Sequence, residues 1–209
     1  DRHLLCASPE RFLCKRGNQL HSQPIKGTAR RHSDPEADRA VRVALANDPK
    51  EQSENVMIVD LVRNDLSRHA AKGSVHVEEL FGVYSFRNLH QLISTVSAEL
   101  REGHSSIAAL RDCFPMGSMT GAPKIRAMEL IEACENRKRG LYSGAIGYFA
   151  PEGDFDFNVV IRSIQYNAVN RLVSYTAGSA ITARAEADRE YDECLLKAES
   201  MRLAVGSRQ

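Results

Sequence analysis

The sequence is poor in the features that would assign a protein class directly. Its five cysteines are scattered and form no C-x-x-C pair, so neither a disulfide framework nor a cysteine zinc site is expected. No apolar run approaches the ~20 residues of a membrane-spanning helix, and the first residues carry no signal-peptide pattern. We therefore expect a cytoplasmic protein without membrane contacts, whose cysteines are reduced, buried, small apolar side chains: Cys6, Cys14, Cys113, Cys134 and Cys194.

Net charge is almost absent as well. The chain has 28 lysines and arginines against 27 aspartates and glutamates, a formal charge of +1. The basic residues are dispersed and form no basic stripe of the kind that binds nucleic acid, so no nucleic-acid partner is expected. With 209 residues, of which 43% are hydrophobic and 26% charged, the composition is that of a globular protein with one large core or two small ones.

Strand signals lie in three parts of the chain. The first 25 residues read as short strands joined by a tight turn, and residues 75–83 and 89–96 carry the β-branched side chains of two more. After residue 140, three segments are predicted to form an antiparallel meander: residues 142–149, 156–166 and 172–177.

Helix signals lie between these strand regions and after them. Asp-Pro pairs at 34–35 and 48–49 predict two helix starts, because aspartate caps a helix and proline suits its first turn. Further helices are expected over 105–113, 123–136 and 186–205. Separate runs of strands and helices favour an α+β fold of antiparallel sheets flanked by helices, with residues 1–209 in a single domain.

Acidic side chains recur at helical spacing on two of the predicted helices. If these helices meet, four carboxylates converge, and such a cluster is stable around an oxygen-preferring cation such as Mg²⁺. The alternative is structural: Glu51 caps its helix, and the later pair forms surface ion pairs with Arg189 and Lys197. The two pairs are Glu51 with Glu54, and Glu190 with Glu193.

Three other features are candidates for chemistry. Lys26, flanked by apolar residues, acts as a nucleophile if a closed site removes its proton, although most lysines are simply surface groups. The glycine-bounded segment Gly117–Lys124 runs into a helix and offers backbone N–H groups to an anion, or is an ordinary helix-entry turn. His90 and Arg162 lie in predicted strands. A buried arginine needs an anionic partner such as a substrate carboxylate, whereas a lone core histidine is usually just hydrogen-bonded.

The order of these motifs is specific, and over nearly the whole chain it resembles the chorismate-utilising enzymes. That family contains anthranilate synthase component I, aminodeoxychorismate synthase component I, isochorismate synthase and salicylate synthase. The resemblance rests on S-P-E-R-F at 8–12, P-I-K-G-T at 24–28, E-N-V-M-I-V-D-L at 54–61, His90, G-S-M-T-G-A-P-K at 117–124, Tyr148, Ile161-Arg162, Ala177-Gly178, E-Y-D-E at 190–193 and Lys197.

Within the family, Lys26 at the third position of P-I-x-G-T is similar to the aminodeoxychorismate synthases, since anthranilate synthases usually have alanine there. The resemblance implies that Lys26 attacks C2 of chorismate while the C4 hydroxyl leaves, and that ammonia then enters at C4 and expels the lysine. Glu10 would be the general acid, because hydroxide leaves poorly unless protonated. The product would be 4-amino-4-deoxychorismate, for para-aminobenzoate and folate synthesis, with a glutaminase subunit as the ammonia source.

The resemblance also implies a set of ligand-binding residues. Glu54 and Glu193 match the principal Mg²⁺ ligands, with Glu51 and Glu190 in support, and the ion would hold the ring carboxylate of chorismate. The enolpyruvyl carboxylate would be bound by Arg162 and Tyr148, aided by backbone N–H groups near Gly178. The other matched pocket residues are Thr120, Gly121, His90 and Lys197.

Departures from the family pattern leave alternatives open. Ala180 stands where the A-G-x-G stretch of the family has its second glycine, and Met116 stands where another glycine is expected. Family members carry a further N-terminal half, so we expect these residues to be a C-terminal portion that is inactive alone. The alternatives are anthranilate, isochorismate or salicylate synthesis, or a non-catalytic module that binds chorismate without turning it over.

Overall fold

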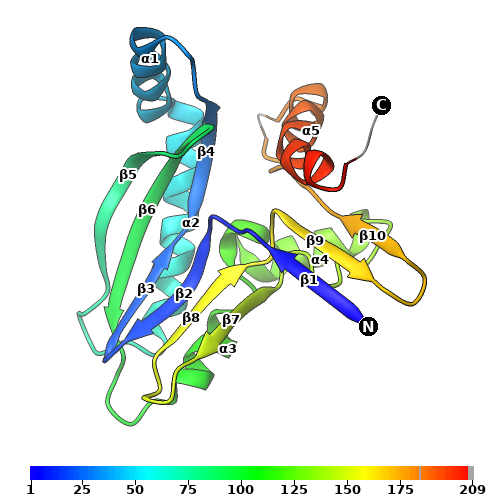
Figure 1. The fold of residues 1–209 in the computed structure, drawn as a ribbon. Helices are drawn as coiled ribbons and strands as arrows, with labels where there is room; N and C mark the ends of the chain where they lie inside the picture. The colour runs from blue at the N-terminus through cyan, green and yellow to red at the C-terminus, as the bar shows by residue number, and fades with distance from the viewer. Residues whose placement is uncertain (184, 207–209) are drawn as a thin grey trace. The chain divides into compact units, whose positions relative to one another are not determined.

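The structure is a computed structural model that describes residues 1–183 and 185–206. The chain divides into two compact units. Unit 1 comprises Asp1–Pro9, Arg139–Gly144 and Val159–Gln209, and unit 2 comprises Glu10–Lys138 and Ala145–Asn158. Among the described residues there are antiparallel sheets and five α-helices (Figure 1). The predicted α+β class is confirmed, while the prediction of a single domain stays a prediction.

Unit 2 is built on a seven-stranded sheet. The strand order is β4-β6-β3-β2-β8-β7. Strand β5 is not part of this order, and it also pairs with β6. The long strand β6 thus pairs with three others, and it organises the sheet. The strands are β2 (Arg11–Arg16), β3 (Gln19–Gln23), β4 (Ile25–Arg30), β5 (His76–Ser85), β6 (Leu89–Glu99), β7 (Ala145–Phe149) and β8 (Phe155–Val159).

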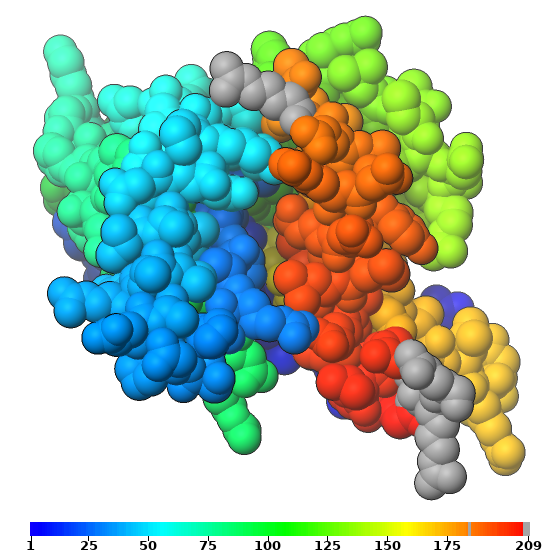
Figure 2. Space-filling model, turned by 90° about the horizontal axis from the view of Figure 1, so that it is seen from above, coloured from blue at the N-terminus to red at the C-terminus, as the bar shows by residue number. Residues whose placement is uncertain are grey.

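Both predicted Asp-Pro helix starts are confirmed. Asp34 accepts a hydrogen bond from Ala37 N at 2.8 Å, and Asp48 accepts one from Lys50 N at 2.8 Å. The two helices pack against β4, β5 and β6, and their outer surfaces form the blue-to-cyan part of the space-filling view (Figure 2). The helices of unit 2 are α1 (Pro35–Ala46), α2 (Pro49–Ser67), α3 (Ser106–Cys113), a 3₁₀ turn η1 (Gly117–Met119) and α4 (Lys124–Cys134).

The core of unit 2 lies between α2 and the sheet. The side chains of Leu20, Leu92 and Val96 on β3 and β6 are completely buried, and Ile58 and Leu66 face them from α2. Burial of this kind is the main favourable term in folding. Four apolar residues of α2 are core positions, namely Ile58, Val59, Val62 and Leu66, whereas Val56 is 40% exposed.

A network of charged groups holds α1 to the sheet. Arg31 Nε donates to Asp38 Oδ2 at 2.8 Å, and the backbone N–H of His32 donates to Asp38 Oδ1 at 2.8 Å. On the other side, His90 Nε2 lies 3.0 Å from Asp38 Oδ1, and His90 Nδ1 lies 2.9 Å from Ser85 Oγ. The Arg31 guanidinium, more than any other group, holds the pKa of Asp38 well below its usual range.

Unit 1 contains a three-stranded antiparallel sheet and the last helix. The strand order is β1-β9-β10, with Leu4 opposite Gln165 and Leu172 opposite Asn167. The last helix is confirmed close to its predicted bounds. The elements are β1 (Arg2–Cys6), β9 (Ser163–Asn167), β10 (Leu172–Tyr175) and α5 (Ala187–Ala204).

The predicted meander after residue 140 is wrong. The expected strand 156–166 is two strands in different sheets, because the backbone leaves the extended conformation between β8 and β9. Arg162 lies in this break with φ +49°, in the left-handed region, and not in a strand as predicted. The apolar run before Arg162 resembles a continuous strand in sequence, but it turns the chain from one sheet to the other.

Two smaller predictions also change. Cys14 and Cys113 are buried and all five cysteines are free, but Cys134 is exposed and the other two are half-buried. The reason is that α4 has no buried residue, although the sequence predicts an amphipathic helix there. Pro123 is the extended N-cap of α4 and not its first helical residue. No helix among the described residues combines the length and apolar character that a bilayer-spanning segment requires.

The core assignment predicts unequal costs for two leucines of the same sheet. Leu20 is fully buried on β3, whereas Leu80 on β5 is 46% exposed. We expect Leu20→Ala to lower the free energy of unfolding by about 2 to 5 kcal/mol, through lost burial and the cavity left behind. Leu80→Ala should cost about 0.5 kcal/mol. Urea denaturation followed by circular dichroism measures both, and equal losses would contradict the assignment.

The Asp38 network predicts a pH-dependent contribution to stability. Because the pKa of Asp38 is lowered in the folded state, its carboxylate stabilises the fold above the ordinary aspartate pKa of about 3.9. That contribution is lost as the pH falls through the folded-state pKa. Asp38→Asn should therefore destabilise the protein at neutral pH, and the difference from wild type should shrink in acid. Urea titrations at several pH values test this, with the exposed Asp60, paired only with Arg63, as Asp60→Asn control.

Candidate active site

Lys26 lies in a bulge of β4. Ile25 pairs with Ile93 and Thr28 with Gln91, so that two residues of β4 stand opposite one residue of β6. The second bulge residue, Gly27, has φ +87°, and a Cβ there would lie 3.2 Å from Glu51 Oε2. Glycine is required both by the backbone conformation and by this close approach. The bulge therefore places the half-buried Lys26 in the stretch of β4 that approaches Glu51.

Residues of α2 are fixed beside this bulge by a side-chain hydrogen bond. Ser94 Oγ donates to Asn55 Oδ1 at 2.6 Å, and the backbone N–H of Ser94 donates to the carbonyl of Pro24 at 3.2 Å. Asn55 is completely buried, so this bond forms in a low-dielectric setting where it is strong. It ties the middle of α2 to β6, next to the chain entering β4.

Glu54 has the property expected of a cation ligand. Its Oε1 atom is buried and has no hydrogen-bond partner, and it forms only a long ion pair, at 4.0 Å, with Lys50 Nζ one helical turn earlier. An unsatisfied buried carboxylate oxygen is costly unless a positive charge reaches it, so Glu54 fits a bound Mg²⁺. Within each unit, the described residues hold no group of three or more His, Cys, Asp or Glu arranged to bind a metal. The predicted meeting of the two acidic pairs, which belong to different units, stays a prediction.

The acidic pair of unit 1 is organised around Lys197. Lys197 Nζ forms an ion pair with Glu193 and donates to the carbonyl of Gly178 at 3.1 Å. Glu190 is 5% exposed and accepts a hydrogen bond from Ser179. The structural alternative predicted that Glu190 and Glu193 form ion pairs with Arg189 and Lys197. The ion pair with Lys197 is present, but Arg189 pairs with Glu186. These contacts hold the segment after β10 against α5.

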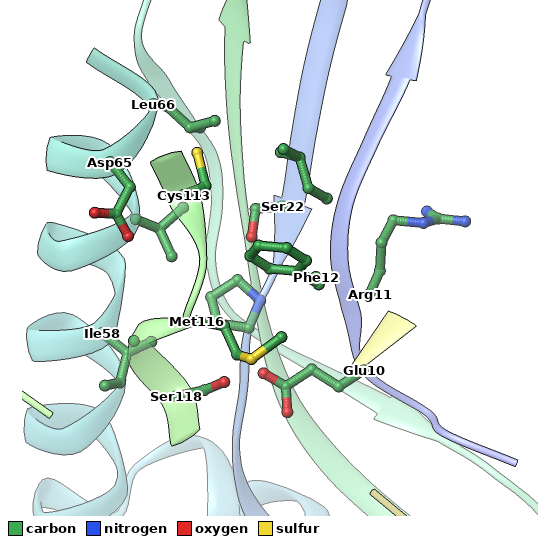
Figure 3. Close-up of a pocket in the computed structure, with 14 residues that line it drawn as sticks. Glu10, Arg11, Phe12, Ser22, Ile58, Asp65, Leu66, Cys113, Met116 and Ser118 are labelled. Atoms are coloured by element: carbon green, nitrogen blue, oxygen red, sulfur yellow. The ribbon is translucent and has the colours of Figure 1, made fainter. Parts of the chain in front are cut away.

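Glu10 lines a cavity between α2, the sheet and η1. The cavity is small, with a volume of about 20 Å³, and Glu10 is 5% exposed. Ser118 contributes a buried hydroxyl without a hydrogen-bond partner, and in Figure 3 the oxygen atoms of Glu10 and Ser118 point toward each other beside Met116. A carboxyl group next to a mostly apolar space is suited to hold and deliver a proton.

The far end of the cavity carries a buried ion pair and a thiol. Lys124 Nζ donates to Asp65 Oδ2 at 2.6 Å. Burial raises the pKa of Asp65, and the charge of Lys124 opposes that shift. Burial, and then the negative charge of Asp65, raise the pKa of the Cys113 thiol to about 12. Cys113 is therefore a protonated core residue and not a nucleophile.

The segment Gly117–Lys124 forms a compact turn before α4. Thr120 Oγ1 donates to the carbonyl of Met116 at 3.1 Å, so the hydroxyl is turned back into the segment. Gly121 has φ +150°, and a Cβ there would lie 3.1 Å from Ala127 Cβ. Both predicted binding residues therefore sit in a segment whose shape depends on local backbone contacts.

His90 and Tyr148 lie at different distances from the Lys26 bulge in the sheet. His90 on β6 pairs with Ala29, three residues after Lys26 on β4, and both its ring nitrogens face protein groups, Asp38 and Ser85. Tyr148 on β7 is 58% exposed, and its hydrogen bond raises the pKa of the neighbouring Arg16. β7 is the last strand of a sheet order that begins with β4. Within unit 2, His90 is therefore on the strand next to Lys26, whereas Tyr148 is at the other end of the strand order.

The sequence analysis did not identify two further candidate functional residues, Tyr142 and Gln91. Tyr142 lies in unit 1, and its hydroxyl is 2.6 Å from the position of a Cβ at Gly178. Hydrogen bonds between residues 143–144 and Val160 pair two segments of the chain. One segment directly follows Tyr142, and the other lies shortly before Arg162. Gln91 on β6 has a buried Oε1 without a partner. Neither residue belongs to a motif that the sequence analysis identified. The hydrogen bonds between residues 143–144 and Val160 locate Tyr142, and the buried oxygen without a partner identifies Gln91.

The comparisons with known proteins agree on one family. The family model described as chorismate binding enzyme matches residues 1–203. The chain is 48% identical over 196 residues to the aminodeoxychorismate synthase of Streptomyces griseus, covering 93% of this chain and 27% of the relative. It is 44% identical over 190 residues to the aminodeoxychorismate synthase component 1 of Escherichia coli (strain K12), covering 91% and 42%.

A solved structure shows the same fold. The putative 2,3-dihydroxybenzoate-specific isochorismate synthase of Bacillus anthracis superposes with a TM-score of 0.88 at 26% identity, covering 99% of this chain and 54% of that one. The chain therefore spans about half of this structure and less than half of the two curated relatives. With a family model that matches all but its last residues, the chain belongs to the chorismate binding enzyme family.

Proposed function

We propose that the protein converts chorismate and ammonia to 4-amino-4-deoxychorismate, as an aminodeoxychorismate synthase component I. The observation that carries the proposal is Lys26, held by the glycine bulge of β4 beside Glu51 of α2. The relatives support it, because aminodeoxychorismate synthases match at 48% and 44% identity over more than nine tenths of the chain.

The chain's own residues would carry the chemistry in two steps. First, the neutral amine of Lys26 forms a bond to C2 of chorismate, both ring double bonds shift by one position toward C4, and the C4 oxygen leaves as water with a proton from Glu10. Second, ammonia bonds to C4, both double bonds shift back, and the C2–N bond breaks to release Lys26 as the neutral amine. The proton lost by ammonia returns to the carboxylate of Glu10, so both groups end as they began.

The proposal includes Mg²⁺, held by Glu54 and Glu193 with Glu51 and Glu190 in support. The ion would supply positive charge to the ring carboxylate of chorismate. The buried oxygen of Glu54, which accepts no hydrogen bond, supports this role, and so does the buried position of Glu190. Lys197, paired with Glu193, would limit the repulsion within the acidic cluster.

The remaining predicted residues would bind the substrate. Arg162, Tyr148 and the backbone near Gly178 would hold the enolpyruvyl carboxylate, and Tyr142, beside Gly178, is a further candidate for this role. Thr120 and Gly121 would contact the ring. His90 would act on the site through Asp38 and Ser85, its two partners.

The proposal extends to the setting of the reaction. A glutaminase subunit would supply ammonia, which is consistent with the designation of the Escherichia coli relative as component 1 of its synthase. A cytoplasmic location is supported by the five free cysteines, since unpaired thiols persist in reducing compartments. The 209 residues alone would be inactive, because they span 42% of that relative.

The lysine mechanism predicts the effect of one substitution. In the natural-length polypeptide given chorismate, Mg²⁺ and ammonium, Lys26→Ala should lower turnover at least about a thousandfold, because no other group forms the bond to C2. Mass spectrometry of the wild type should show aminodeoxychorismate and a chorismate-derived adduct on the protein that is absent from the variant. Lys72→Ala, at an exposed turn position, is the control.

Other products would overturn parts of the proposal. Anthranilate or isochorismate would show that Lys26 does not mark the aminating subgroup. Unchanged chorismate, from a folded protein that still binds Mg²⁺, would establish a binding module without catalysis. A nearly unaffected rate in Lys26→Ala would remove this lysine from the nucleophile role.

The metal assignment predicts that Glu54→Gln weakens Mg²⁺ binding. We expect the dissociation constant, measured by calorimetry with chorismate present, to rise at least about tenfold, because an amide has no charge to offer the ion. Chelation of Mg²⁺ should abolish wild-type turnover, and added Mg²⁺ should restore it. Glu129→Gln, at an exposed helical glutamate of α4, should bind Mg²⁺ like the wild type. Equal affinity in the Glu54 variant would refute the assignment.

A further inference from the structure

We infer that the Asp65–Lys124 ion pair positions the segment Gly117–Pro123 on α2 and thereby sets the place of Thr120 and Gly121. We call this segment the turn segment. The inference rests on the proposed function for one point, which is that the turn segment contacts substrate. Asp65 and Lys124 touch no reacting atom in this scheme and act as positioning residues.

The Asp65–Lys124 ion pair is buried. Lys124 Nζ donates to Asp65 Oδ2 at 2.6 Å and to the carbonyl of Cys113 at 3.2 Å. The two side chains are only 7% and 16% exposed, for Asp65 and Lys124 respectively. Such a pair contributes little net stability compared with well-packed apolar residues, but losing one partner leaves a buried charge. Its specific effect is to hold Lys124, the first residue of α4, at one point of α2.

The other end of the turn segment is held by close packing. A Cβ at Gly117 would lie 3.0 Å from Leu61 Cδ1 and 3.1 Å from Leu61 Cβ, so the backbone of Gly117 lies directly on α2. Leu61 and Asp65 are four residues apart and therefore neighbours on one face of the helix. Both ends of the turn segment dock on adjacent turns of α2.

Between these two anchors the turn segment is internally bonded. Met119 N donates to Met116 O at 3.1 Å, and Thr120 N donates to Gly117 O at 3.2 Å. The hydroxyl of Thr120 also bonds back to Met116 O. These bonds make residues 116–120 a compact turn, so the position of the turn segment depends on how its two ends are held. Removing the Lys124 anchor releases one of these ends.

The same helix carries the acidic residues of the proposed site. Glu54, Ile58, Leu61 and Asp65 follow one another at three- and four-residue spacing, which places them along one side of α2. A shift of the turn segment along this side would change its separation from Glu54. The ion pair therefore sets the spacing between the proposed metal ligand and the proposed ring contacts.

The first test measures the turn segment without substrate. Asp65→Asn and Lys124→Met should each speed hydrogen exchange of the amides in 117–122 at least about tenfold, while amides of the first turns of α2 keep their wild-type rates. Arg126→Met, which breaks the exposed Arg126–Glu129 pair on the same helix, should leave both regions unchanged. Uniformly faster exchange across unit 2, or no change in the turn segment, would refute the inference.

The second test measures substrate use in the natural-length polypeptide. The double variant Asp65→Leu/Lys124→Met removes both buried charges and retains apolar packing, so it should regain thermal stability relative to the single variants. We expect its KM for chorismate to stay raised about tenfold, with a smaller change in kcat, because the anchor is still missing. A wild-type KM in the stable double variant would show that the pair serves stability alone and overturn the inference. If the wild type itself does not turn over chorismate, the proposed function fails, and the exchange experiment alone decides on the anchor.

Discussion

Helix α2 lies against β4 and β6, and the candidate groups of unit 2 take their positions from that contact. The buried hydrogen bond between Ser94 and Asn55 fixes the middle of the helix, and the missing side chain at Gly27 lets Glu51 approach β4. Farther along, Gly117 rests on Leu61 and Lys124 on Asp65. One helix thus carries the proposed metal ligand, the surroundings of the lysine and the anchors of the turn segment, so small displacements of α2 would alter all three.

Buried charge is handled in two ways around this helix. Asp38 and Asp65 are each paired with a cation, Arg31 and Lys124, which compensates for the water they lose. Glu54 Oε1, in contrast, is buried without a hydrogen-bond partner, and its ion pair with Lys50 Nζ is long, at 4.0 Å. A buried carboxylate oxygen that accepts no hydrogen bond is costly unless a ligand completes its contacts. This contrast is the physical support for a cation at Glu54.

The local parts of the fold were predictable from the sequence, and the break between sheets was not. The caps at Asp34 and Asp48 and the bounds of α5 depend on neighbours in sequence, so capping and periodicity predict them. The change from β8 to β9 depends on which sheet each half joins, and an apolar run contains no such information. For the same reason Tyr142 was overlooked, since only the pairing of residues 143–144 with Val160 reveals which chain segments meet.

The sequence by itself determined the family and the chemical groups, because the order and spacing of its motifs identify a set of side chains with defined chemistry. It singled out Lys26, Glu10 and Glu54 without any coordinates. Only the tertiary structure decided that Lys26 sits in a glycine bulge, that Glu54 has a buried oxygen that accepts no hydrogen bond, and that Asp65 and Lys124 form a buried pair. Burial and pairing are properties of residues distant in sequence, and they arise only when α2, the sheet and the turn segment pack together.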